Sequence, residues 1–219
     1  MLDSEYAKRT QFKYIFGSIP VYEVAQPSFD IPRMIESLQD KLPIRFIEPI
    51  GLDAVVICET PEFEKREIDA FVQDSTIYIR ASQRDENSVV YDIIHEVAHI
   101  IEEKRYEEIY GDGELVAEFL EKRRLLYHKL DEHGHAPELE RFEEIDYTQA
   151  LDNYLNHSVG YEELAWISMH IFIVPYSATS IREYFASGFE FFYAQDDLKN
   201  ELRKMSPVLY QRIQILHED

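Results

Sequence analysis

The pattern of hydrophobic and polar positions divides the chain into a mixed amino-terminal part and a mainly helical carboxyl-terminal part. Residues 31–42 carry apolar side chains at helical spacing, and they follow Asp30, a candidate N-cap, and Pro32 at an early helical position. Three short strands are then predicted, at residues 45–50, 54–59 and 76–80. This order of elements predicts an α+β fold built around a small twisted sheet.

The most informative pattern lies directly after the third strand. Six apolar residues form one stripe at helical spacing: Val90, Ile93, Ile94, Val97, Ile100 and Ile101. Asn87 or Ser88 is expected to cap this helix. At about 100° per residue, His95 and His99 fall on the opposite face. The helix is therefore expected to pack on the sheet through its stripe and to present both histidines to a cleft.

The rest of the chain is predicted to be helical. Residues 102–150 are highly charged, with a break at 132–137, and further helices are expected at 161–172, at 180–194 and, shorter, after Pro207. We expect an amino-terminal extension at residues 1–30 and one domain at 31–219.

Composition narrows the classes of partner. The formal charge of −21 disfavours nucleic acid and anionic membrane surfaces, and it favours a neutral or basic peptide or protein. Cys58 is the only cysteine, so no intramolecular disulfide can form.

Residues 1–14 lack the apolar run of a signal peptide, and residues 167–175 are too short to span a bilayer. We therefore expect a cytoplasmic protein without a membrane span. Export by a route that requires no cleavable signal remains an open alternative.

The charged face of the amphipathic helix carries a pattern with specific chemistry. His95, Glu96 and His99 form His-Glu-x-x-His, in which residues four apart share one helical face and can bind one zinc ion. Glu96 can then act as general base on a zinc-bound water. Two imidazoles do not complete a catalytic site, because zinc needs a third protein ligand and an open position.

Spacing alone leaves the third ligand open. Glu183 lies on the polar face of the predicted helix 180–194, but it also follows Ser180 at the spacing of a capping box, in which it would only tie the start of the helix. Glu118 follows His99 with eighteen residues between them, which is the spacing of zinc aminopeptidases. Glu114 lies in a segment similar to the second helix of zinc peptidases that cleave phage repressors.

A second motif adds a family resemblance. The residues Glu183-Tyr184-Phe185-Ala186, followed by Phe189 and preceded by Tyr176, resemble the lethal-factor family of zinc proteases, which includes the catalytic domain of anthrax lethal factor and the secreted Pro-Pro endopeptidases. The tail matches as well, at Leu198, Pro207 and Tyr210. The resemblance covers residues 30–219 and implies a zincin-like fold. It also implies that His95, His99 and Glu183 bind Zn²⁺, that Glu96 is the general base and that Tyr176 donates a hydrogen bond to the oxyanion.

The chain departs from this family at two places. Ser187 stands where the family has a glutamate that orients a ligating histidine, and Asp92 and Glu190 are two candidates to substitute for it. Residues 104–150 look like an acidic helical insertion, with either a structural role or the role of a lid or exosite.

These observations predict a zinc-dependent metalloendopeptidase. One alternative is a catalytically weak or inactive binding protein that keeps the zincin scaffold. Another is an intracellular peptidase that cleaves a regulator and uses Glu118 or Glu114 as its third ligand.

Overall fold

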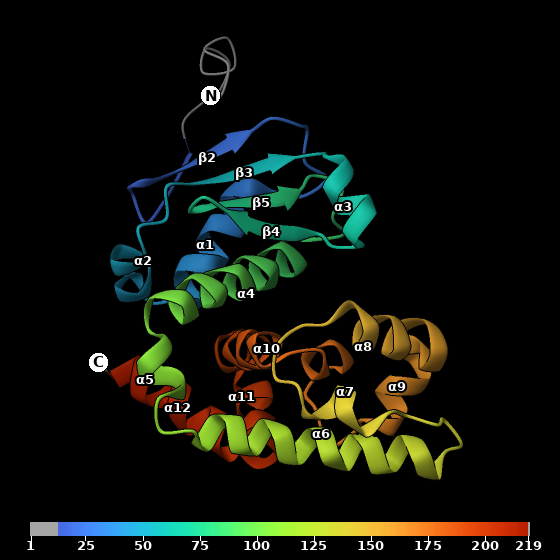
Figure 1. Cartoon of the computed structure of the whole chain (residues 1–219). Coiled ribbons are helices and arrows are strands. Elements are labelled where there is room, and N and C mark those ends of the chain that lie inside the picture. The colour runs from blue at the N-terminus through green and yellow to red at the C-terminus, as the bar shows by residue number, and fades with distance from the viewer. Residues whose placement is uncertain (1–12, 219) are drawn as a thin grey trace. The chain divides into compact units, whose positions relative to one another are not determined.

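The computed structural model describes residues 13–218 of the chain, and these residues form two compact units that meet between Lys104 and Arg105 of the sequence (Figure 1). The expectation about a signal peptide falls mainly on residues 1–12, outside the described residues. Within the described part of the chain, no helix has the length and apolar character that crossing a membrane requires.

The first unit contains a mixed five-stranded sheet. Its strands are β1 (Lys13–Ile15), β2 (Ile19–Glu23), β3 (Ala54–Cys58), β4 (Ala70–Gln73) and β5 (Thr76–Arg80), in the order β1-β2-β3-β5-β4. The three inner strands run parallel, and β1 and β4 are antiparallel to their neighbours. All five residues of β3 are buried, as expected for a central strand covered on both faces.

The helices of the described part of this unit are α1 (Ile31–Lys41), α2 (Ile44–Ile50), α3 (Pro61–Arg66) and α4 (Glu86–Lys104). The helices α1 and α4 pack against each other, and α4 also packs on β4 and β5 (Figure 1). Phe63 of α3 packs against Val56 and Cys58 of β3. The sheet therefore positions α4, the helix that carries the His-Glu-x-x-His motif.

Several predicted elements of this unit are confirmed. Asp30 caps α1 by accepting a hydrogen bond from the Arg33 amide at 3.0 Å. The predicted strands at 54–59 and 76–80 correspond to β3 and β5. The whole predicted stripe of α4 is buried. The α+β class is confirmed at this level.

Other predictions for this unit are wrong. Residues 45–50 form helix α2 rather than a strand, because Phe46, Ile47 and Ile50 are buried at helical spacing. The helix α4 begins at Glu86, and Asp85 accepts a hydrogen bond from the Ser88 amide at 3.0 Å, so neither Asn87 nor Ser88 is its cap. The strands β1, β2 and β4 and the helix α3 were not predicted.

The second unit is helical. It contains α5 (Tyr106–Tyr110), α6 (Glu114–Glu132), α7 (Leu139–Glu143), α8 (Gln149–Asn153), the π-helix η2 (Tyr154–Gly160), α9 (Tyr161–Ile167), the 3₁₀-helix η3 (Pro175–Ala178), α10 (Ile181–Ala194), α11 (Asp196–Met205) and α12 (Pro207–Glu218). The helix α10 packs against η3, α11 and α12, and α6 packs against α7 and α12 (Figure 1). The predicted helices at 180–194 and after Pro207 and the break after Glu132 are confirmed.

The predicted helix at 161–172 is too long. The helix α9 ends at Ile167, and His170 is exposed and has a φ of 70°, which is not helical. Pro175 begins η3, which fits the preference of proline for the first helical turn. The helix α11 was not predicted.

Candidate metal centre

The two histidines of the motif lie side by side on α4. Their ring centroids are 4.9 Å apart, and the ring planes are inclined by 80°. Both belong to a regular 19-residue helix, so the four-residue spacing gives them a common face. His99 is 9% exposed, while His95 and Glu96 are half-buried. The motif is thus held rigidly and partly shielded from water.

A buried acid that sequence analysis did not single out lies beside His99. Glu102 is 2% exposed, and its carboxylate Oε2 lies 3.6 Å from Nδ1 of His99. This separation is that of an ion-pair contact rather than a hydrogen bond, and it places a negative charge beside the ring of His99. The signal was available in the sequence, because Glu102 follows His99 by three residues on the same helix. Asp92 and Glu190 stay predictions for the role of orienting a ligating histidine.

The start of α10 positions Glu183. Ser180 is the N-cap, and its hydroxyl accepts a hydrogen bond from the Glu183 amide at 3.2 Å. This confirms the Ser180 half of the predicted capping box. Ser187, one turn after Glu183, is buried within α10. The backbone of Ile181 donates to the carbonyl of Ile145 at 2.8 Å, which ties the start of the helix to the segment between α7 and α8.

Tyr176 lies in the short 3₁₀-helix η3, seven residues before Glu183, and 37% of it is exposed. Burial, and then the negative charge of Glu183, raise the pKa of its phenol well above the usual range. The hydroxyl therefore remains a hydrogen-bond donor at neutral and moderately alkaline pH. This is the protonation state that the predicted role requires.

Among the described residues, His95, His99 and Glu183 are the group of three side chains that could hold a metal ion, with one ligand atom from each and these atoms within 4.8 Å of one another. Two imidazole nitrogens and one carboxylate oxygen match the donor set of catalytic zinc sites. A buried acid, Glu102, also lies beside one of the two histidines. The residues present therefore fit Zn²⁺.

The alternative third ligand Glu118 is engaged elsewhere. Its carboxylate accepts hydrogen bonds from the Tyr184 hydroxyl at 2.8 Å and from the backbone amides of Val208 and Leu209 at 2.8 and 3.1 Å. It thus stabilises the amino terminus of α12. Glu114, the other alternative, is exposed at the first turn of α6.

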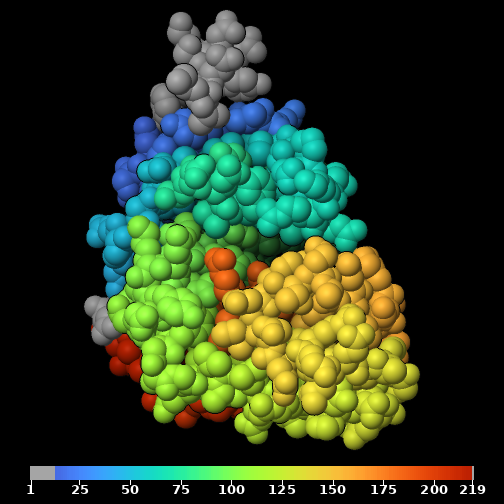
Figure 2. Space-filling view, viewed as in Figure 1, coloured from blue at the N-terminus to red at the C-terminus, as the bar shows by residue number. Residues whose placement is uncertain are grey.

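A cluster of hydroxyl groups and one acid lies in the second unit. The carboxylate of Asp152 accepts hydrogen bonds from the hydroxyls of Tyr147 at 2.8 Å and Tyr161 at 3.3 Å. Burial and the charge of Asp152 raise the pKa of Tyr161 well above its usual range, and Glu183 acts in the same direction. The segment from α7 to α8, drawn in yellow and light orange, lies at the surface in the space-filling view (Figure 2).

This cluster depends on a break in the helix. Residues nine apart on a straight α-helix lie on opposite faces and are displaced by about 13 Å along the axis. Asp152 and Tyr161 meet because the π-helix η2 intervenes and Gly160 adopts a φ of 87°. Sequence analysis missed the cluster because neither feature leaves a periodic signal.

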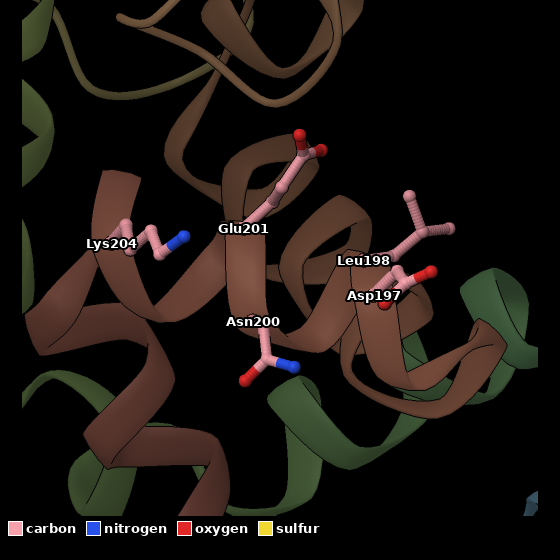
Figure 3. Close-up of a pocket in the computed structure, with 5 residues that line it drawn as sticks. All are labelled: Asp197, Leu198, Asn200, Glu201 and Lys204. Carbon is pink, nitrogen blue, oxygen red and sulfur yellow. The ribbon is translucent and has the colours of Figure 1, made fainter.

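One surface hollow lies apart from these residues. It has a volume of about 530 Å³ and is lined by residues of α11 alone: Asp197, Leu198, Asn200, Glu201 and Lys204 (Figure 3). The hollow contains none of the candidate zinc ligands.

Comparison of the chain with models of protein families, with curated proteins and with solved structures gives no match.

Proposed function

We propose that the protein is a zinc-dependent peptidase that hydrolyses peptide bonds, with His95, His99 and Glu183 as zinc ligands. The observation that carries this proposal is the grouping of these three side chains, with Glu96 next to His95 on the same helix. The resemblance of both motifs to the lethal-factor family of zinc proteases supports the same assignment. A peptide or protein of neutral or basic character suits the acidic chain best.

Each remaining group has a defined task in this reaction. A bound zinc ion supplies Lewis-acid chemistry, which acidifies water and polarises a carbonyl group. Glu96 accepts the proton of the attacking water and passes it to the leaving amine. Tyr176 donates its hydroxyl proton in a hydrogen bond to the carbonyl oxygen while negative charge develops on that oxygen. Glu102 holds His99 in orientation.

The ligand set is tested by the zinc content of the purified chain, measured by elemental mass spectrometry. We expect about one zinc per chain in the wild type, and loss of zinc in Glu183→Ala. Glu201→Ala is the control, because Glu201 is an exposed acidic residue of α11 in the same unit and has no assigned role in the site. Equal zinc content in the wild type and in Glu183→Ala would exclude Glu183 as the third ligand.

The reaction is tested separately with Glu96→Gln. This variant is isosteric but cannot accept the proton, so we expect it to keep its zinc and to lose cleavage of a mixed peptide library, read by mass spectrometry. Cleavage at the wild-type rate would refute the role of Glu96. Absence of cleavage by the wild type, with zinc bound, would favour the binding protein on a zincin scaffold.

A further inference from the structure

Charged residues of α6 are buried within the second unit. Arg123 is fully buried, and Lys122 is 7% exposed. Burying a charge is costly unless hydrogen bonds compensate for the lost water. The hydrogen bonds of these two side chains therefore indicate which parts of the unit the buried charges stabilise.

Arg123 joins two distant parts of the chain. Its Nη1 donates to the carbonyl of Arg141 at 2.9 Å, and its Nη2 donates to the carbonyl of Thr179 at 3.1 Å. The guanidinium also lies over the ring of Phe119, 4.9 Å from its centroid. Burial lowers the pKa of Arg123 to about 10, so the side chain remains charged at neutral pH.

In the sequence, Thr179 lies between Tyr176 and Glu183, the two residues of this segment to which we assign roles in the reaction. It is three residues after Tyr176 and four before Glu183. Thr179 is itself bound to Tyr176, because its amide and its hydroxyl both donate to the Tyr176 carbonyl, at 3.0 and 2.7 Å. Arg123 therefore anchors the turn that links η3 to α10.

Glu118, five residues before Arg123 on α6, anchors the other side of Glu183. It accepts the hydrogen bond of the Tyr184 hydroxyl, and Tyr184 follows Glu183 directly. Two charged side chains of one helix thus hold the segment on both sides of the proposed ligand.

We propose that Arg123 is a positioning residue of the candidate zinc site, which holds residues 176–183 in the geometry that Tyr176 and Glu183 need. This inference rests on the proposed function for its consequence in zinc binding, but not for the contact itself. Under this proposal, part of the charged segment 104–150 has a structural role, which is to support the candidate zinc site.

Lys122 provides a matched comparison. It is the neighbour of Arg123 and is nearly as buried, and its ammonium donates to the carbonyls of Ile171 and Met205, both at 2.7 Å. These acceptors lie outside residues 176–183, and so does the ring of Tyr184, whose centroid is 5.9 Å from the ammonium. Loss of Lys122 should weaken the core of the unit without releasing the turn.

The experiment compares Arg123→Gln and Lys122→Gln in the full chain, with Arg123→Lys as a milder second variant in case Arg123→Gln does not fold. Amide hydrogen exchange of residues 176–183 is measured by mass spectrometry. Global stability is measured by urea unfolding, so that variants of similar stability are compared. We expect exchange in this segment to be at least about tenfold faster in the Arg123 variants and unchanged in Lys122→Gln.

Zinc affinity supplies the second readout, by competition with a chelator. We expect the dissociation constant to rise about 10- to 100-fold in the Arg123 variants and to stay near the wild-type value in Lys122→Gln. Unchanged exchange, or equally increased exchange in both sets of variants, overturns the proposal. Faster exchange with unchanged zinc affinity overturns the link to the zinc site. Absence of zinc in the wild type instead refutes the proposed function, while the exchange data still decide whether Arg123 holds the turn.

Discussion

The carboxylate of Glu102 stands beside the imidazole of His99, and this contact gives a test at the scale of one residue. Replacing Glu102 by Gln removes the negative charge beside the ring, and with it the orienting contact that we propose. We expect zinc affinity to fall about 10- to 100-fold, measured by chelator competition. Glu103→Gln is the control, because Glu103 is the exposed neighbour of Glu102 on α4. Equal affinities in Glu102→Gln and the wild type would show that Glu102 has only a packing role.

Tyr176 gives a second test at this scale. Tyr176→Phe removes one hydroxyl that would donate to the oxyanion, and loss of such a donor costs about 3 kcal/mol in the transition state, or roughly a hundredfold in kcat. Zinc content should not change. The comparison is Tyr106→Phe, an exposed tyrosine of the same unit. A turnover number for Tyr176→Phe equal to that of the wild type would remove Tyr176 from the mechanism.

At the residue scale, sequence reasoning identified the candidate groups that belong to recognisable spacings. His95, Glu96 and His99 follow from a motif on an amphipathic helix, and Glu183 follows from a second motif and the resemblance. Glu102 was missed because a single acid near the end of a charged helix resembles a solvated residue. Only the structure shows that it is buried.

At the scale of elements, the π-helix η2 and Gly160 define how Asp152 meets Tyr161. Gly160 has a φ of 87° and a ψ of 136°, a backbone conformation that residues with a Cβ rarely adopt. A Cβ at this position would meet no heavy atom within 4 Å, so the strain of Gly160→Ala comes from the backbone alone. We expect Gly160→Ala to lower the free energy of unfolding by about 1–3 kcal/mol, measured by urea denaturation.

Ser158→Ala serves as the control for this variant, since Ser158 is an exposed residue of the same π-helix. A loss in Gly160→Ala no larger than that of Ser158→Ala would contradict the assigned conformation.

Long periodic elements were predicted well, and short ones were not. The helices α1, α4 and α10 carry apolar stripes and N-caps, so periodicity located them. The helix α2 was assigned as a strand because a seven-residue element is too short for its apolar spacing to separate helix from strand. The strand β4 was not predicted because its four residues, Ala70–Gln73, show no alternation of apolar and polar side chains.

At the scale of the whole molecule, we expect the free energy of unfolding to change with pH in the alkaline range. Burial, and then Glu118, raise the pKa of Tyr184 well above its usual value of 10 in the folded chain. The unfolded chain therefore loses this proton first, and the contribution of Tyr184 to stability is complete below pH 10 and declines above it. The decline is at most about 1.4 kcal/mol per pH unit. Urea unfolding of zinc-free protein at several pH values between about 9 and 11.5 measures it.

The wild type alone is not sufficient for this test, because the lowered pKa of Arg123 acts in the opposite direction. The quantity to compare is the slope of stability against pH in the wild type and in Tyr184→Phe, with Tyr106→Phe as control. The slope should be more negative in the wild type than in Tyr184→Phe. Equal slopes would show that Tyr184 does not titrate as its burial requires.

The outer strand β4 has a consequence for how copies of this protein behave together in solution. An edge strand exposes unpaired amide and carbonyl groups, on which another chain can build a continuous sheet. Here the edge is only four residues long and is followed at once by the turn at Asp74 and Ser75, both of which have positive φ. Combined with the mutual repulsion of chains that each carry a charge of −21, this short edge should resist fibril growth near neutral pH. That protection should weaken as the solution approaches the isoelectric point near pH 4.7.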